Sequence, residues 1–193
     1  LSNLNDDDVF ISTPTNRLFG LQCSYTYAPR NLRRISYAND ADGNTLFGKK
    51  DLSIINGVES DSDQHSPILG WAYYGNPIYG PYGYSRRDGG DIVQIKSGYV
   101  EEASKKDNRP PVSSFPPEFF VEDFTFKTSN DDSVLDENNG RFCVTPEYPN
   151  GTYAYFATFD STSASDGVFK NFKKPVFPYL IGNKYNSRPN KFN

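Results

Sequence analysis

The sequence predicts an all-β protein, built as a single β-sandwich or an irregular barrel-like domain with long loops and little helix. Three observations predict this class. Several stretches alternate apolar and small polar residues, as half-buried strands do. The 193 residues include 15 Gly and 14 Pro, which leave few uninterrupted stretches for a helix. Aromatic residues make up 16% of the chain, so we expect an aromatic rather than an aliphatic core.

The clearest strand candidates are residues 19–27 (FGLQCSYTY), 124–127 (FTFK) and 151–159 (GTYAYFATF). Each places large apolar groups on one face and smaller groups on the other. Pairs that tolerate positive φ separate such stretches, among them Asp88-Gly89-Gly90, Asn139-Gly140 and Asn150-Gly151. Many short strands joined by frequent turns favour a sandwich or an irregular barrel.

The chain shows no internal repeat and no clear boundary, so we expect one domain over residues 1–193. Residues 1–8 and 186–193 are expected to be linker or frayed ends. Residues 101–117 combine charges with two proline pairs, which predicts an extended surface excursion. The chain opens at Leu1 and contains no methionine, so we expect it to be a piece of a longer protein or a processed product.

Composition argues against two classes of partner. The net charge is −4, and the pairs Arg33-Arg34 and Arg86-Arg87 are isolated, so we expect no nucleic-acid partner. No apolar run approaches the roughly 20 residues that a membrane-spanning helix needs. Cys23 and Cys143 do not make a disulfide framework; we expect two buried thiols, with a long-range bridge as the alternative.

Histidine and acidic residues are the candidate metal ligands and catalysts of this chain. His65 is the single histidine, too few for an ordinary zinc site, and no Gly-x-Ser-x-Gly segment supports a Ser-His-Asp triad. We therefore expect a structural histidine, no metal and no cofactor. Calcium stays a candidate at Asp40, Asp42 and Asn44, whose oxygens alternate as in a calcium loop, although the glycine stands in the wrong place for an EF-hand.

Asp136 and Glu137 precede Asn138-Asn139-Gly140-Arg141 and allow two interpretations. In the first, a carboxylate accepts backbone bonds of the turn and pairs with Arg141, as a structural lock. In the second, two carboxyls flank a sugar, as in glycoside hydrolases, where they lie about 5–10 Å apart. We favour the lock.

Residues 65–84, HSPILGWAYYGNPIYGPYGY, hold aromatic side chains in a series of tight turns. They form either a rigid aromatic core, which is the more ordinary outcome, or a stacking platform for a sugar ring or a partner protein. The candidate binding residues of this platform are His65, Trp71, Tyr73, Tyr74, Tyr79 and Tyr82.

This segment, followed by LDENNGRFCVTPEYPNGTYAYF and FPYLIGNKY, resembles the YHYH domain. The resemblance runs from His65 to Tyr185, with the blocks in the same order. The tetrad Tyr-His-Tyr-His that names the family is here Tyr153-Ala154-Tyr155-Phe156. Positions 154 and 156 point to one face of a strand, so we expect a packed apolar face there. Any chemistry that the tetrad histidines perform elsewhere is lost from these positions.

The form with FFVED at residues 119–123 is similar to versions found in large structural proteins of tailed bacteriophages. The resemblance therefore implies a non-catalytic virion module of a tail, baseplate or tail fibre, located in the virion or otherwise extracellular. Its partners would be other virion proteins or copies of itself. The alternative is a carbohydrate-binding or host-adhesion module that contacts a cell-surface glycan through Trp71 and the tyrosines. A glycoside hydrolase ranks third.

Overall fold

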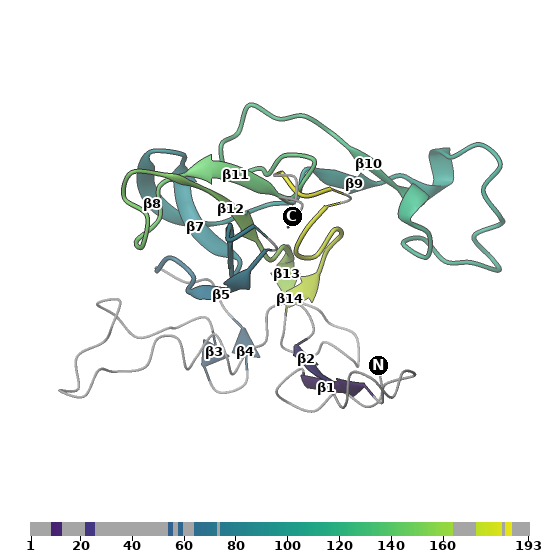
Figure 1. The fold of residues 1–193 in the computed structure, drawn as a ribbon. Coiled ribbons are helices and arrows are strands. Elements are labelled where there is room, and N and C mark those ends of the chain that lie inside the picture. The colour runs from purple at the N-terminus through teal and green to yellow at the C-terminus, as the bar shows by residue number, and fades with distance from the viewer. Residues whose placement is uncertain are drawn as a thin grey trace, which may run out of the picture.

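The computed structural model describes residues 64–72, 74–163, 173–182 and 184–186, together with the backbone of four short strands nearer the N-terminus (Figure 1). These four strands form two antiparallel hairpins. The first pairs β1 (Val9–Ser12) with β2 (Gln22–Tyr25), and the second pairs β3 (Ile54–Ile55) with β4 (Val58–Glu59).

The largest sheet has four strands in the order β11-β12-β6-β5. Its members are β5 (Ile68–Trp71), β6 (Pro77–Tyr79), β11 (Gly140–Cys143) and β12 (Thr152–Phe156). The pairs β5–β6 and β11–β12 are antiparallel, whereas β12 runs parallel to β6. The parallel pairing joins two hairpins that are distant in sequence and places β12 in the interior of the sheet.

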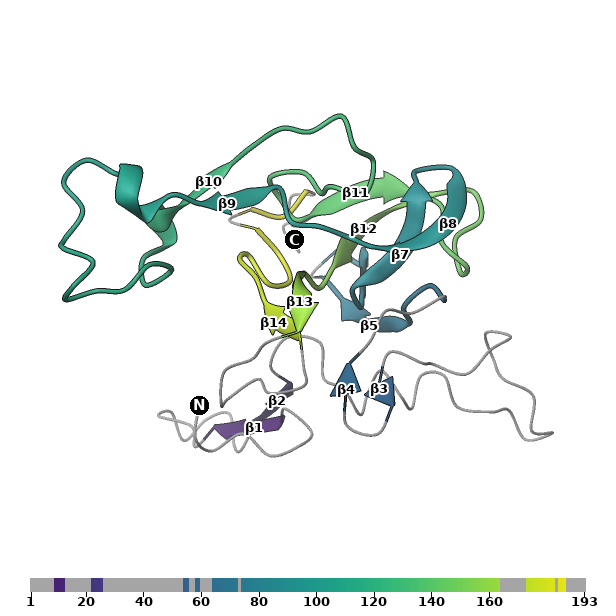
Figure 2. The same cartoon turned by 180° about the vertical axis from the view of Figure 1, so that it is seen from behind.

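Three further antiparallel pairs surround this sheet. They are β7 (Tyr82–Arg86) with β8 (Gly89–Gln94), β9 (Tyr99–Glu101) with β10 (Phe124–Phe126), and β13 (Phe159–Ser163) with β14 (Lys173–Pro175). The β7–β8 hairpin is strongly curved in both views (Figures 1 and 2). Gly89 and Gly90 at its turn have φ of 130° and 103°, which glycine adopts without steric cost.

The core lies between the main sheet and the β7–β8 hairpin and its continuation. Its buried members are Tyr79, Ile95, Leu135, Cys143, Ala154 and Phe156. Two of the largest are aromatic, as the composition predicts, and the chain after β8 adds Ile95 to them. A smaller cluster, with Ala157 and Phe159 at its centre, lies next to Leu69 and Leu180.

Between β9 and β10 the chain leaves this body and forms an arm, defined here as residues 102–123. It contains two 3-10 helices, η1 (Ala103–Lys105) and η2 (Val121–Asp123). The arm projects to the right in Figure 1 and to the left in Figure 2. The surface excursion predicted at residues 101–117 is therefore confirmed, and it extends further, to residue 123.

The predicted all-β class with little helix is confirmed: the helices in the described ranges have three residues each. The strands form several small sheets, and those that the structure describes do not close into a barrel. The predicted strands at 124–127 and 151–159 correspond to β10 and to β12 with the start of β13. Among the described residues, no helix is long and apolar enough to cross a bilayer. Of the predicted ends, 1–8 and 186–193, all residues except Asn186 lie outside the described residues, and the Asn186 amide donates to the Tyr155 hydroxyl at 2.9 Å.

Candidate functional site

Two of the three segments that carry the family resemblance, those at residues 135–156 and 177–185, meet at Asn139. Its side-chain amide donates to the carbonyl oxygens of Phe156 at 2.9 Å and Leu180 at 3.2 Å. Beside it, the Gly182 amide donates to the Asn138 carbonyl at 2.9 Å. Asn139 is fully buried and has φ of 61°, a conformation that asparagine tolerates better than most residues. The sequence identified Asn139 only as a turn residue, because nothing in its pattern shows which carbonyls its side chain reaches.

The tetrad positions on β12 are packed, as predicted. Ala154 and Phe156 share one face of the strand, and both side chains are fully buried. The Phe156 ring stacks on Tyr79 with centroids 5.5 Å apart, and the Arg141 guanidinium lies 5.4 Å above it. The position that carries the tetrad's second histidine in the family is therefore a packing position of the core in this chain.

His65 lies in the same cluster. Its ring is 4.8 Å from Tyr79, 5.2 Å from Tyr84 and 6.0 Å from Phe156, measured between centroids. Nδ1 lies 2.8 Å from the Ser66 carbonyl oxygen, which can only accept a hydrogen bond. The neutral ring is therefore assigned as the tautomer with its proton on Nδ1. Desolvation by burial is the largest cause that lowers the pKa of His65 to about 4, and the nearby Arg141 charge lowers it further. His65 is thus a neutral core residue at pH 7 rather than part of an exposed binding surface.

The carboxylate of Asp136 closes the turn over residues 136–140. Its Oδ1 accepts bonds from the amides of Asn138 at 2.9 Å and Gly140 at 3.2 Å. The Tyr153 hydroxyl donates to both carboxylate oxygens, at 2.9 and 2.8 Å. Burial, together with the adjacent carboxylate, raises the pKa of Tyr153, so the phenol stays protonated and continues to donate. Glu137 is exposed, and its backbone carbonyl accepts a bond from the Tyr99 hydroxyl at 2.8 Å.

Arg141 does not pair with Asp136 or Glu137, which corrects part of the predicted lock. Its guanidinium is buried and donates to the carbonyl oxygens of Asp132 and Tyr84, each at 2.6 Å. Arg141 points away from the turn because β11 directs it toward the β7–β8 hairpin. Arg141 therefore joins β7 to the loop before β11, a clamp that sequence spacing alone does not reveal.

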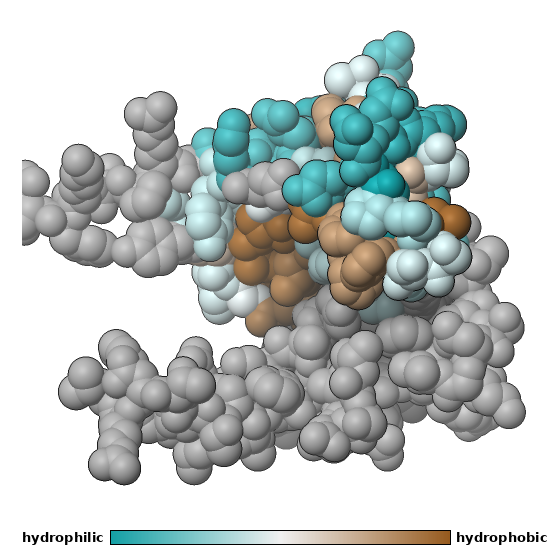
Figure 3. Space-filling model, turned by 90° about the vertical axis from the view of Figure 1, so that its right-hand side faces the viewer, coloured by the Kyte–Doolittle hydropathy of each residue, from teal (hydrophilic) through white to brown (hydrophobic). Residues whose placement is uncertain are grey.

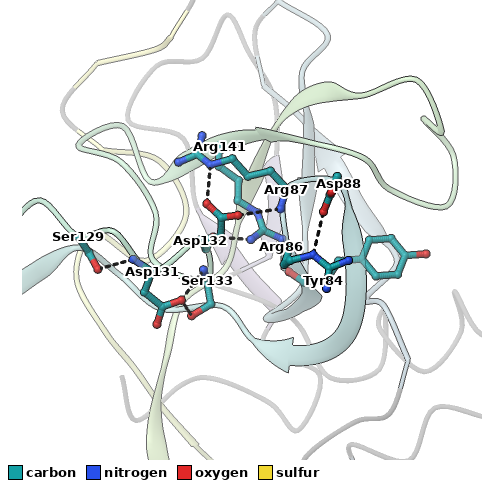
Figure 4. A network of polar contacts seen from close by, with 9 residues as sticks. All are labelled: Tyr84, Arg86, Arg87, Asp88, Ser129, Asp131, Asp132, Ser133 and Arg141. Carbon is teal, nitrogen blue, oxygen red and sulfur yellow. Dashed lines mark hydrogen bonds and ion pairs between the residues drawn. The ribbon is translucent and has the colours of Figure 1, made fainter.

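Around this clamp, charged side chains form an exposed rim (Figure 4). Arg87 Nε donates to Asp132 Oδ1 at 3.1 Å, and Arg86 Nε donates to Asp88 Oδ1 at 3.0 Å. Both pairs are more than a third exposed, so solvent screens them and each contributes little to stability. The Arg87–Asp132 pair connects the hairpin to the loop before β11, whereas the Arg86–Asp88 pair lies within the hairpin turn.

The proposed aromatic platform is not assembled as one surface. Tyr79 and Tyr82 are buried, as expected for the core alternative, and Tyr74 is half-buried. The Tyr79 hydroxyl donates to Thr145 Oγ1 at 2.8 Å and to Glu147 Oε2 at 2.7 Å, inside the protein. Trp71 is 62% exposed. Tyr73 lies outside the described residues.

The remaining candidates are less informative. Asp40, Asp42 and Asn44 lie outside the described residues. Within the described ranges, no group of three or more His, Cys, Asp or Glu side chains is placed to hold a metal ion. Cys143 is a free, buried thiol whose pKa is raised chiefly by desolvation. The side chain of Cys23 is not among those described.

The fold and these contacts define an all-β scaffold in which the motif residues join distant backbone segments. The sequence model of the YHYH protein family matches residues 29–169, well over half of the chain. The chain belongs to the YHYH family. The match begins before His65 and ends before the last motif segment at residues 177–185, so its range differs from that of the resemblance seen in the motifs. No curated protein and no solved structure gave a match.

Proposed function

We propose that this chain is a non-catalytic structural module that works by contact within a larger assembly, of the kind found in the tail, baseplate or tail fibre of a tailed bacteriophage. The observation that carries the proposal is the burial of Phe156, together with Ala154, at the positions where the family tetrad has histidines. A side chain that fills the core cannot meet a substrate, so this region acts as scaffold.

The polar groups of the motif support the same conclusion. Asp136 and Asn139 direct their hydrogen bonds to backbone groups of neighbouring segments or to Tyr153, and Arg141 bonds to two backbone carbonyls. Such groups are oriented by the fold and hold it in return. The virion context comes from the similarity of the FFVED-containing sequence to structural proteins of tailed phages.

Purified particles of the virus that encodes the chain provide the test. Mass spectrometry should detect the chain as a stoichiometric component, and gold-labelled antibodies against the recombinant chain should decorate one part of the tail. Antibody absorbed beforehand with the recombinant chain is the control. A chain that is expressed during infection but absent from purified particles would refute the proposal.

A glycan-binding module is the second candidate, because Trp71 exposes 62% of its surface on the edge strand β5. Exposed tryptophan stacks well on sugar rings. A glycan array should give a signal that Trp71→Ala abolishes. Phe142→Ala is the matched control, because Phe142 is 59% exposed on the opposite edge strand β11. An array without signal, or signal that survives Trp71→Ala, would exclude this candidate.

A further inference from the structure

The arm has its own small interior, organised by Arg109. The Arg109 guanidinium binds Asp123 through two bonds, Nε to Oδ1 at 2.5 Å and Nη2 to Oδ2 at 2.8 Å. It also donates to the carbonyls of Pro110 at 2.8 Å, Phe115 at 3.0 Å and Pro116 at 3.0 Å. Both charged side chains are almost wholly buried. One guanidinium thus connects both ends of the proline-rich loop to η2. The arm therefore has an internal hydrogen-bonded structure of its own.

This interior presents apolar side chains outward. The Phe115, Phe119 and Phe120 rings contact one another with centroids 5.0–5.3 Å apart, and Arg109 lies 5.2 Å over the Phe120 ring. We call the tip the set Val112, Phe115, Phe119, Phe120 and Val121. Phe119 is 60% exposed, and Val112 and Val121 are each more than half exposed. From the side on which the arm projects, residues of high hydropathy (brown) form patches beside hydrophilic residues (Figure 3).

The arm is also fixed to the body. At its base, the Phe124 ring stacks on Phe177 with centroids 4.3 Å apart and planes 12° apart, and Tyr99 meets the same ring edge-on at 5.0 Å. Glu102 accepts bonds from Lys105 at 3.0 Å and Lys127 at 3.2 Å. A tip held in one geometry loses little conformational entropy on binding, and exposed aromatic clusters of this kind are typical of contact sites.

The charges of the tip indicate the chemistry of its partner. Residues 110–122 contain two charged side chains, Glu118 and Glu122, and both are exposed. The positive charge of Arg109 is matched by Asp123 inside the arm. An apolar tip with the exposed carboxylate of Glu122 at its edge is attracted to cationic groups and repelled by an anionic lipid surface.

A second copy of the chain fits this chemistry less well than another protein does. On the described body, the exposed Arg86, Arg87, Lys96 and Lys127 already pair with carboxylates of the same chain. The chain as a whole carries a net charge of −4, so two copies repel each other.

We propose that the arm inserts its tip into an apolar socket, rimmed by lysine or arginine, on a different protein of the assembly. This inference rests on the proposed function. Phe119 and Val121 enter the socket, and Glu122 faces the cationic rim. Arg109 acts as a positioning residue, since it contacts no partner and holds the tip in its outward geometry.

Photo-crosslinking in the assembled particle tests this proposal. The probe is p-benzoylphenylalanine in place of Phe119 in the full chain, with the same probe at Phe142 on the body as the matched control. After irradiation, mass spectrometry should place the Phe119 cross-link on one segment of another protein that carries apolar residues beside lysine or arginine. The Phe142 probe should not reach that segment.

Charge and order of the tip are tested in the same system. Glu122→Lys should lower the Phe119 cross-link yield several-fold, whereas Glu122→Asp should leave it nearly unchanged. Arg109→Gln should also lower the yield, with faster amide exchange confined to the arm. A yield insensitive to Glu122→Lys would overturn the assignment of a cationic rim.

The remaining outcomes separate this inference from the proposed function. Particles that contain the chain but give no Phe119 cross-link, or a cross-link to a copy of the chain or to lipid, overturn the inference and leave the proposed function standing. Two results with the purified chain have the same meaning. One is a dimer that Phe119→Ser dissociates, and the other is sedimentation with vesicles of phosphatidylcholine and phosphatidylserine. Particles without the chain overturn the proposed function and this inference with it.

Discussion

The single histidine of this chain makes its acid sensitivity a test of how the core is built. The pKa of His65 is lowered to about 4, mainly by desolvation, whereas an unfolded chain has a histidine pKa near 6.5. Between these two pH values His65 is protonated in the unfolded chain and neutral in the folded chain. The free energy of unfolding therefore falls as pH falls. At about 1.4 kcal/mol per pKa unit, the loss contributed by His65 reaches about 3 kcal/mol at pH 4 and disappears above pH 6.5.

Urea unfolding followed by far-UV circular dichroism at several values between pH 7.5 and pH 5 measures this loss. The matched variant is His65→Asn, which removes the titration while keeping a donor of similar reach for the Ser66 carbonyl. Over pH 7.5 to 5 the wild type should lose about 2 kcal/mol more than the variant. Carboxylates with lowered pKa values, such as Asp131, lose their contribution at lower pH and are present in both proteins. Parallel pH profiles of the two proteins would refute the assignment of His65 as a desolvated core residue.

Four substitutions test the scaffold by the same unfolding measurement. Phe156→Ala should lower the free energy of unfolding by about 3–5 kcal/mol, because this ring is fully buried. Phe142→Ala should lower it by less than about 0.5 kcal/mol, because this ring is largely exposed. Equal losses would contradict the placement of β12 in the core. Gly182→Ala should cost about 1–3 kcal/mol, because the added methyl meets backbone atoms of the 136–140 turn, and a neutral effect would mean that the turn lies elsewhere. Tyr153→Phe should cost about 1.5–3 kcal/mol by removing the bond to the Asp136 carboxylate, unless that bond is absent in solution.

Local patterns in the sequence were sufficient for the fold class and for the buried face of β12. Alternation at residues 151–159 predicts a strand, and a period of two places positions 154 and 156 together. Glycine pairs predict turns because glycine adopts positive φ without steric cost, as Gly89 and Gly90 do. These are short-range effects, in which a residue and its immediate neighbours decide the conformation.

The long-range contacts could not be predicted in this way. Arg141 stands five positions after Asp136, and the spacing suggested an ion pair, yet its guanidinium reaches carbonyls of β7 and of residue 132. The bond between Arg109 and Asp123 spans 14 positions with no periodic pattern between them. Such contacts depend on which segments tertiary folding brings together: the β7–β8 hairpin and the loop at residue 132 for Arg141, and the two ends of the arm for Arg109.

The family motif of this chain and the contact surface that we propose for the arm occupy different parts of the molecule, and the reason is physical. Asn139, Asp136 and Gly182 fix backbone segments against one another, so substitutions there would disturb the core before they changed any surface. A residue that holds the backbone in this way has few polar atoms left for a partner. The arm differs, because its one buried ion pair satisfies its own polar groups and leaves the apolar side chains of the tip outward. If the proposed contact through the arm is correct, substitutions in the arm change the partner, whereas the motif residues preserve the fold.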